Sequence, residues 1–266
     1  MARALFLGMD LFDTAAAYGA GASESALGIA LRACGADAHV STKAVVPLEG
    51  LGDVRGAVLR CVEGSLRRLG RSSLTLLFLH NRVAAQRNEC WRLGVGPVLS
   101  VDDVLGANGV ADAFAELRRD GVVRCAGITA YGGEMPAVAK VIESGAIDAV
   151  NVSYSVANPS AFLDVACVRW EEHYAGVGAL AASEGLGVLG IRVLASGALV
   201  QETRADGGPA AAFGLAKDLG EGDPVDGALR FVLTTPGVSS AVIGVSRAAH
   251  ADAAAAAVRR GSLDAD

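Results

Sequence analysis

The sequence has little of the positive charge that marks several classes of protein. Only three of its 23 basic residues are lysines, no run of Lys or Arg exceeds two residues, and the net charge is −6. Proteins that bind nucleic acid carry a basic patch or stripe, so this class is excluded. Outside the alanine-rich stretches, no apolar run approaches the roughly 18 residues that a membrane helix needs. The N-terminus shows no signal peptide, and we expect a cytoplasmic protein that binds neither nucleic acid nor membranes.

Cysteine and histidine are also sparse, and neither occurs in pairs that could hold a metal. The five cysteines are odd in number and contain no C-x₂-C pair, and none of the four histidines has a ligand-spaced partner. A disulfide framework and a structural zinc site are therefore excluded. No G-x-G-x-x-G follows a predicted strand, so a Rossmann mode of dinucleotide binding is not indicated.

What the sequence does contain is a core-forming composition with a regular alternation of elements. The apolar fraction is 52% in 266 residues, and short apolar runs suited to buried parallel strands alternate with amphipathic or alanine-rich stretches. The predicted strands are 9–13, 39–43, 74–80, 123–129, 146–154, 186–194 and 239–245. The predicted helices are 23–34, 53–69, 110–120, 136–144, 174–183, 224–234 and 247–259. Ser23 and Glu24 are expected to begin the first of these helices.

This alternation predicts an α/β fold with a parallel sheet. The length suits a single TIM-type (β/α)₈ barrel over residues 1–266. Seven strands are recognisable, and the chain begins in a helix-like segment at 2–8. We therefore expect an N-terminally shortened barrel that lacks the first strand. The segments 81–107 and 195–223 are predicted to be long loops that serve a site.

Four chemically active side chains follow or end the first three predicted strands. Asp13, Lys43 and His80 are strand ends, and Tyr18 lies five residues after Asp13. The C-terminal ends of parallel strands meet at one mouth. An ammonium beside a phenol favours the ionised phenol, a carboxylate orients the ammonium, and a neutral imidazole can donate to a substrate oxygen. Together they predict general acid catalysis, in which a developing alkoxide is protonated.

Ordered motifs along nearly the whole chain resemble the aldo-keto reductase superfamily, in particular its bacterial general reductases. The strongest are F-D-T-A-x-x-Y-G at 12–19, G-x-S-E-x-x-L-G at 21–28, S-T-K at 41–43 and L-H-N at 79–81. Weaker matches follow at 109–118, 121–130, 151–155, 190–199 and 242–246. The resemblance implies an oxidoreductase that transfers hydride between NADPH, or NADH, and a small carbonyl or alcohol substrate.

The resemblance also implies roles for individual residues. Tyr18 would be the proton donor, Asp13 and Lys43 would adjust the acidity of its hydroxyl, and His80 would orient the carbonyl of the substrate. The residues implied to bind the cofactor are Thr129 and Asn151 at the carboxamide, Tyr154 against the nicotinamide, Leu194, Gly197 and Leu199 near the pyrophosphate, and Gly244, Ser246, Arg247 and His250 at the adenosine phosphate. Tyr154 ends a predicted strand, and Ser246 and Arg247 begin a predicted helix whose N-terminus would attract phosphate.

Three departures from the family pattern leave other functions open. The usual front hairpin and first strand are absent, and Ala130 and Ala254 stand where the family has asparagines that contact the cofactor. A dehydratase, lyase or isomerase could reuse the four side chains without redox chemistry. A non-catalytic scaffold that senses the cofactor is the third possibility. A homo-oligomer could cover the unpaired strand edge that the missing strand leaves.

Overall fold

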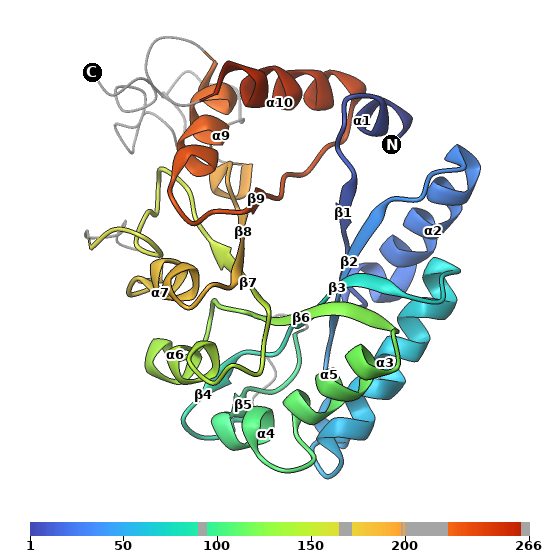
Figure 1. The fold of residues 1–266 in the computed structure, drawn as a ribbon, viewed down its shortest axis with the longest axis vertical. Helices are drawn as coiled ribbons and strands as arrows, with labels where there is room; N and C mark the ends of the chain where they lie inside the picture. Colours follow the sequence, from blue (N-terminus) through green and yellow to red (C-terminus); the bar gives the residue numbers. More distant parts are fainter. Residues whose placement is uncertain (90–94, 165–171, 198, 200–222, 262–266) are drawn as a thin grey trace. The chain divides into compact units, whose positions relative to one another are not determined.

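The computed structural model describes residues 1–89, 95–164, 172–197, 199 and 223–261 (Figure 1). The chain divides into two compact units, Met1–Val150 and Asn151–Asp266. The expectation of one domain over residues 1–266 stays a prediction. None of the helices in the described ranges has the length and apolarity needed to cross a bilayer.

The first unit is built on parallel strands in the order β1-β2-β3-β6-β7. Their bounds are Leu11–Asp13 for β1, His39–Ala44 for β2, Leu74–Leu79 for β3, Val123–Thr129 for β6 and Ala149–Ser153 for β7. In the register, Asp13 lies opposite Ser41, and Leu79 lies opposite Ile128. The strands β3, β6 and β7 bury mainly apolar side chains, as parallel sheets covered on both faces do, whereas β2 buries the polar side chains of Ser41, Thr42 and Lys43.

Helices alternate with these strands. They are α1 (Ala2–Phe6), α2 (Ala22–Cys34), α3 (Val54–Leu69), α4 (Val101–Leu105), α5 (Val110–Arg119) and α6 (Met135–Ile142), with 3-10 turns at η1 (Tyr18–Gly21) and η2 (Leu48–Gly50). The helix α3 packs between α2 and α5 in Figure 1. Its buried residues recur every three or four positions, the spacing of one helix face. Asp53 caps its first turn through the Gly56 amide, and Gly70 ends it at φ 65°.

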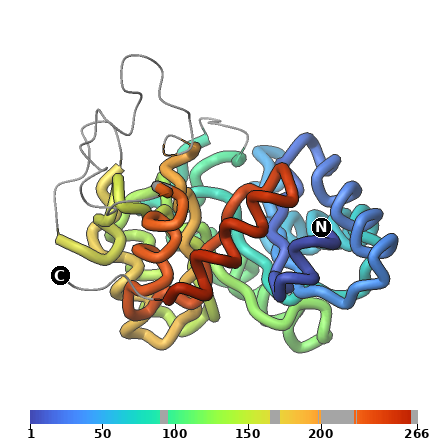
Figure 2. The backbone as a smooth tube through the Cα atoms, turned by 90° about the horizontal axis from the view of Figure 1, so that it is seen from above, coloured from blue at the N-terminus to red at the C-terminus, as the bar shows by residue number. Residues whose placement is uncertain are grey.

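In the second unit the strand order is β7-β8-β9, with β8 at Gly187–Ile191 and β9 at Ser240–Ala241. The helices are α7 (Val177–Ser183), α9 (Pro224–Thr234) and α10 (Ala248–Arg260), and η3 (Ala195–Gly197) follows β8. The helices α9 and α10 lie side by side, orange to red in Figure 2. Parallel strands with intervening helices confirm the predicted α/β class of TIM-type barrels, with seven strands in the main sheet of the described chain.

Two local predictions were wrong. The segment 81–107 is not one long loop, because Val83–Ala84 and Leu99–Ser100 pair as the parallel strands β4 and β5, and α4 follows. Val83, Leu99 and Val104 of this segment are buried, and β4 and α4 pack against α6. The helix α2 begins at Ala22, one residue early, because Gly21 takes φ 91° as its N-cap. Of the predicted loop 195–223, residue 198 and residues 200–222 lie outside the described residues.

The close approach of α2 to α3 depends on Gly28. A Cβ added there would lie 2.3 Å from the carbonyl oxygen of Leu69, which is backbone and has little freedom to move. We expect Gly28→Ala to cost about 1–3 kcal/mol of stability by overpacking. The melting temperature should fall by roughly 5 °C for a chain of this size, measured by circular dichroism. Gly52→Ala, where a Cβ would meet nothing within 4 Å, is the matched control; equal melting temperatures for both variants would contradict the prediction.

Candidate active site

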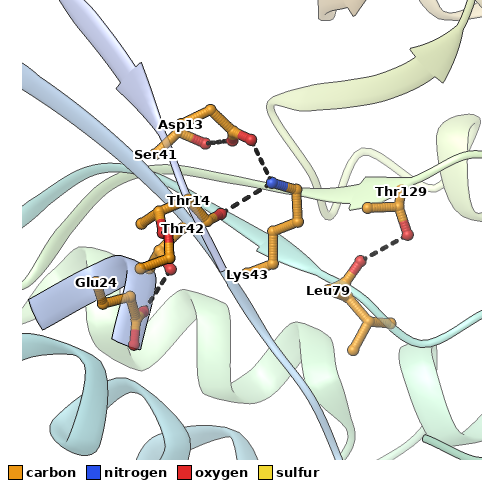
Figure 3. Close-up of polar contacts among 9 residues, drawn as sticks. Asp13, Thr14, Glu24, Ser41, Thr42, Lys43, Leu79 and Thr129 are labelled. Carbon is orange, nitrogen blue, oxygen red and sulfur yellow. Dashed lines mark hydrogen bonds and ion pairs between the residues drawn. The ribbon is translucent and has the colours of Figure 1, made fainter. Parts of the chain in front are cut away.

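The side chains of Asp13 and Lys43 form a buried ion pair between the adjacent strands β1 and β2 (Figure 3). The Lys43 Nζ donates to Asp13 Oδ2 at 2.5 Å and to the carbonyl oxygen of Thr14 at 2.9 Å. The Ser41 hydroxyl donates to the other carboxylate oxygen at 2.8 Å. The side chains of Lys43 and Asp13 are 2% and 10% exposed. The predicted contact between this acid and this lysine is therefore present.

Burial and pairing act on Lys43 in opposite directions. Removal from water lowers the pKa of the lysine, whereas the charge and the hydrogen bond of Asp13 raise it, and the net direction is downward from 10.5. Without Asp13 a charged Lys43 would have no counter-ion at this position. Asp13 therefore serves to keep the ammonium form available in a dry strand.

Tyr18 and His80 complete the group. The Lys43 Nζ lies 5.1 Å from the centroid of the Tyr18 ring, and the rings of Tyr18 and His80 meet edge to face with centroids 5.8 Å apart. Tyr18 lies in η1, where Gly19 and Ala20 take positive φ, and it is 43% exposed. The first unit thus brings all four predicted catalytic residues together, with the tyrosine accessible to a substrate.

His80 is buried and neutral. Removal from water, and secondarily the charge of Lys43, lowers the pKa of the imidazole from 6.5 to about 4. Its Nδ1 is buried and has no hydrogen-bond partner among the described residues. Its backbone N–H donates to the Ala44 carbonyl at 2.8 Å, which fixes the end of β3 against β2. A neutral imidazole is both a donor and an acceptor, as the predicted role at a carbonyl oxygen requires.

Glu24, Thr42 and Arg68 form a second polar cluster on the other side of β2, where the sequence predicts no site residue. Side chains alternate along β2, so Ser41 and Lys43 face Asp13 while Thr42 points to the other side. There the Thr42 hydroxyl donates to Glu24 at 2.6 Å, and the Arg68 Nε donates to the second carboxylate oxygen at 2.6 Å. Glu24 is fully buried. Its place in the G-x-S-E motif at 21–24 and the consecutive polar residues 41–43 of the predicted strand were the signals that could have indicated this cluster.

The end of β6 carries Thr129, the remaining predicted site residue of the first unit. Its hydroxyl donates to the Leu79 carbonyl at 3.0 Å, which leaves the oxygen lone pairs to accept from another group. The next residue, Ala130, is fully buried and offers no polar atom from its side chain.

In the second unit, Asn151 is the residue whose surroundings best fit a cofactor amide. It is fully buried, and neither Oδ1 nor Nδ2 has a hydrogen-bond partner among the described residues. Leaving both atoms unpaired costs free energy, which a ligand with a donor and an acceptor would recover. A carboxamide is such a group, so this residue fits the nicotinamide end of the predicted cofactor.

Tyr154 lies in a different environment from the one expected. Its ring is 1% exposed, stacks on Phe231 with centroids 5.4 Å apart and tilts against Phe162, and its hydroxyl lies 2.8 Å from the Thr235 Oγ1. Burial raises the pKa of this phenol. In the structure the ring belongs to the core of the unit, and its contact with the nicotinamide stays a prediction.

The predicted pyrophosphate segment follows β8 and has an unusual backbone. Arg192, Ala195 and Ser196 all take positive φ, between 47° and 55°, and Gly197 follows at 92°. Left-handed backbone at residues other than glycine stores strain and is concentrated at ligand sites. Leu194 and Leu199 anchor the segment by packing with Ala157 and Ala228.

The four residues predicted at the adenosine phosphate are exposed around the start of α10. They are Gly244, Ser246, Arg247 and His250. The Ser246 Oγ lies 3.4 Å from the His250 Nδ1, and Arg247 is the N-cap of the helix, with no side-chain cap bond. A basic side chain and open amides at a helix start fit a phosphate. Ala254 is buried, and its methyl group offers no hydrogen bond to a cofactor in place of the family's asparagine.

The sequence model of the Aldo/keto reductase family matches residues 1–266 of the chain. The chain belongs to this family. An aldo-keto reductase from Bacillus halodurans in its holo form is 21% identical and superposes with a TM-score of 0.72, covering 99% of this chain and 81% of that one. An aldo/keto reductase from Klebsiella pneumoniae, solved with NADP and acetate, is 20% identical with a TM-score of 0.68, covering 99% and 79%. No curated protein sequence matches the chain.

Membership of the aldo/keto reductase family confirms the expected class of enzyme, an oxidoreductase that uses a nicotinamide cofactor. The family match spans both compact units. The roles of the individual site residues stay predictions.

The neutrality of His80 has a measurable effect on stability. Its pKa is 6.5 when free and about 4 when folded, so the unfolded chain binds the proton more readily between these values. The contribution of the neutral His80 to the free energy of unfolding is fully present above about pH 6.5 and is lost as the pH falls toward 4. Urea unfolding at pH 7 and pH 4 should show that the wild type loses about 3 kcal/mol more than His80→Gln. Equal losses in the two proteins would mean that His80 is not buried as a neutral group.

Proposed function

We propose that the protein is an NADPH-dependent reductase of a small aldehyde, ketone or sugar-like substrate, or catalyses the reverse oxidation, with Tyr18 as proton donor. The observation that carries the proposal is the meeting of Asp13, Tyr18, Lys43 and His80 at the ends of neighbouring strands. When bound, NADPH supplies a hydride to the carbonyl carbon. The oxygen then needs one proton, and the first unit offers a phenol to provide it.

Each member of the group has a distinct task in this proton transfer. Tyr18 is the accessible member and gives its hydroxyl proton to the developing alkoxide. Lys43, held in place by Asp13 and the Thr14 carbonyl, supplies the positive charge that favours the resulting phenolate. His80 is neutral near pH 7 and can donate an N–H to the carbonyl oxygen without giving up a net charge.

Residues of the second unit support NADPH as the cofactor. Asn151 has an unpaired donor and acceptor for a carboxamide. Ser246, Arg247 and His250 are exposed at the N-terminus of a 13-residue helix, which favours an anion. An aldo-keto reductase from Klebsiella pneumoniae is described in complex with NADPH. Arg247 favours NADPH over NADH because guanidinium pairs well with phosphate.

We place the activity in the cytoplasm, since Cys34, Cys61 and Cys125 are free thiols and reducing conditions preserve them. At one end of the sheet order, β1 has only β2 as its strand neighbour within the described residues. A homo-oligomer that covers the other edge of β1 stays a prediction.

Removing the Tyr18 hydroxyl tests the mechanism. We expect Tyr18→Phe to lower kcat for NADPH-dependent aldehyde reduction by about 10²–10⁴-fold, the usual worth of a general acid. Absorbance at 340 nm measures the rate, and circular dichroism checks the fold. Tyr174→Phe, which also deletes a phenol hydroxyl, is the matched control and should stay near the wild-type rate. Full activity in Tyr18→Phe, or turnover by dialysed protein without any nicotinamide, would overturn the proposal.

The choice of cofactor is tested at Arg247. Arg247→Gln should reduce the ratio of kcat/KM for NADPH to that for NADH by roughly 10-fold, the value of one charge-assisted hydrogen bond. Arg259→Gln removes an exposed arginine from the other end of α10 and should leave this ratio unchanged. The same ratio in both variants would argue against phosphate recognition by Arg247.

A further inference from the structure

Arg82 differs from the other arginines of the first unit in having a buried but unpaired guanidinium atom. It lies three residues beyond the end of β3 and is partly buried. Its Nε is buried with no hydrogen-bond partner among the described residues. In contrast, Arg55, Arg68, Arg87 and Arg118 each form an ion pair with an acidic side chain.

The Arg82 side chain packs closely on the backbone of Gly132. Gly132 lies three residues beyond the end of β6 and takes φ 73°, and a Cβ built there would come within 2.4 Å of the Arg82 Nε. The guanidinium therefore lies directly on a glycine backbone that has room for no other side chain. The Arg82 carbonyl accepts from the Leu99 amide at 2.9 Å, which ties the residue to β5.

Its position relates Arg82 to the proposed active site. The strands β3 and β6 are paired neighbours, with Leu79 opposite Ile128. Their ends carry His80 and Thr129, and Arg82 and Gly132 follow at the same end of the sheet. Two consecutive trans peptides span at most about 7 Å between the Cα atoms of His80 and Arg82.

Glu134, two residues after Gly132, forms no ion pair with Arg82 within the described chain. Its Oε2 accepts a hydrogen bond from the Ala85 amide at 2.8 Å. A buried donor without an acceptor costs free energy that an incoming anion would recover. Among anions, a carboxylate matches the planar fork of a guanidinium through two parallel hydrogen bonds.

We propose that Arg82 binds a carboxylate on the substrate, so that the preferred substrates are short oxo acids, with an aldehyde or ketone a few carbons from the acid group. This inference rests on the proposed carbonyl reduction and specifies the substrate class for the same site. Arg82 is then a specificity-determining residue, and the tetrad does the chemistry.

Paired substrates test the proposal. Initial rates with NADPH are compared for 4-oxobutanoate against butanal and for 5-oxopentanoate against pentanal. The wild type should prefer the acid of at least one pair in kcat/KM. In Arg82→Gln that preference should fall by about 10- to 100-fold, chiefly through KM, because a charge-assisted pair is lost. Arg82→Lys, which keeps the charge but not the fork, should retain part of it.

The control variant is Arg124→Gln, which removes an exposed arginine near the start of β6 and should keep the wild-type preference. Three outcomes would overturn the proposal: no preference for either acid in the wild type, equal losses for acids and neutral aldehydes in Arg82→Gln, or a larger Arg82 dependence for glyceraldehyde 3-phosphate against glyceraldehyde. The last would assign the residue to phosphate.

A binding measurement separates this proposal from the proposed function. If no aldehyde is reduced, the proposed function fails, and Arg82 is tested by the melting temperature in glutarate against 1,5-pentanediol. Glutarate should raise the melting temperature of the wild type and not of Arg82→Gln, because a ligand that binds the folded state stabilises it. Equal effects in both proteins would overturn the assignment of Arg82.

Discussion

The structure of the proposed active site depends on one constraint, the need to keep a lysine charged inside a parallel sheet. The ammonium of Lys43 is stable in that position because Asp13 and the Thr14 carbonyl surround it. This requires β1 to run beside β2 in the observed register, even though β1 has three residues. The turn that follows β1 then carries Tyr18 to within 5.1 Å of the same ammonium. The position of Tyr18, the proposed proton donor, is therefore tied to that of the buried ion pair.

The order of the elements and the meeting of Asp13, Tyr18, Lys43 and His80 could be predicted from the sequence, and most of their surroundings could not. Alternating apolar runs and amphipathic stretches are local patterns, and residues at the ends of parallel strands converge whatever the details of the loops. The links from Glu24 to Thr42 and Arg68 connect positions 18 and 44 residues apart, and no local pattern specifies them. The pairing of β4 with β5 is missed for the same reason, since two-residue strands carry almost no periodic signal.

The residues expected to bind the cofactor show which features a family resemblance can predict and which it cannot. Asn151 meets the expectation with its unpaired amide atoms, and the backbone from Arg192 to Gly197 is strained in the way that ligand loops often are. Tyr154 has the expected sequence position but packs against Phe231 and Phe162. A motif fixes the type of side chain and its place in the chain, whereas the neighbours that cover it come from elements distant in sequence.

The burial of Glu24 has a consequence for the ionic conditions under which the protein works. Exposed pairs such as Arg67 with Glu63 and Arg60 with Asp53 lie in bulk solvent, where dissolved ions screen them within about 8 Å at physiological ionic strength. The carboxylate of Glu24 is shielded from such ions, as is Lys43 beside Asp13. Salt therefore weakens the ion pairs on the outside of α3 more than the ion pairs of the buried Lys43 and Glu24, which flank β2. The strand that carries Lys43 is held by electrostatic contacts that depend little on the salt concentration.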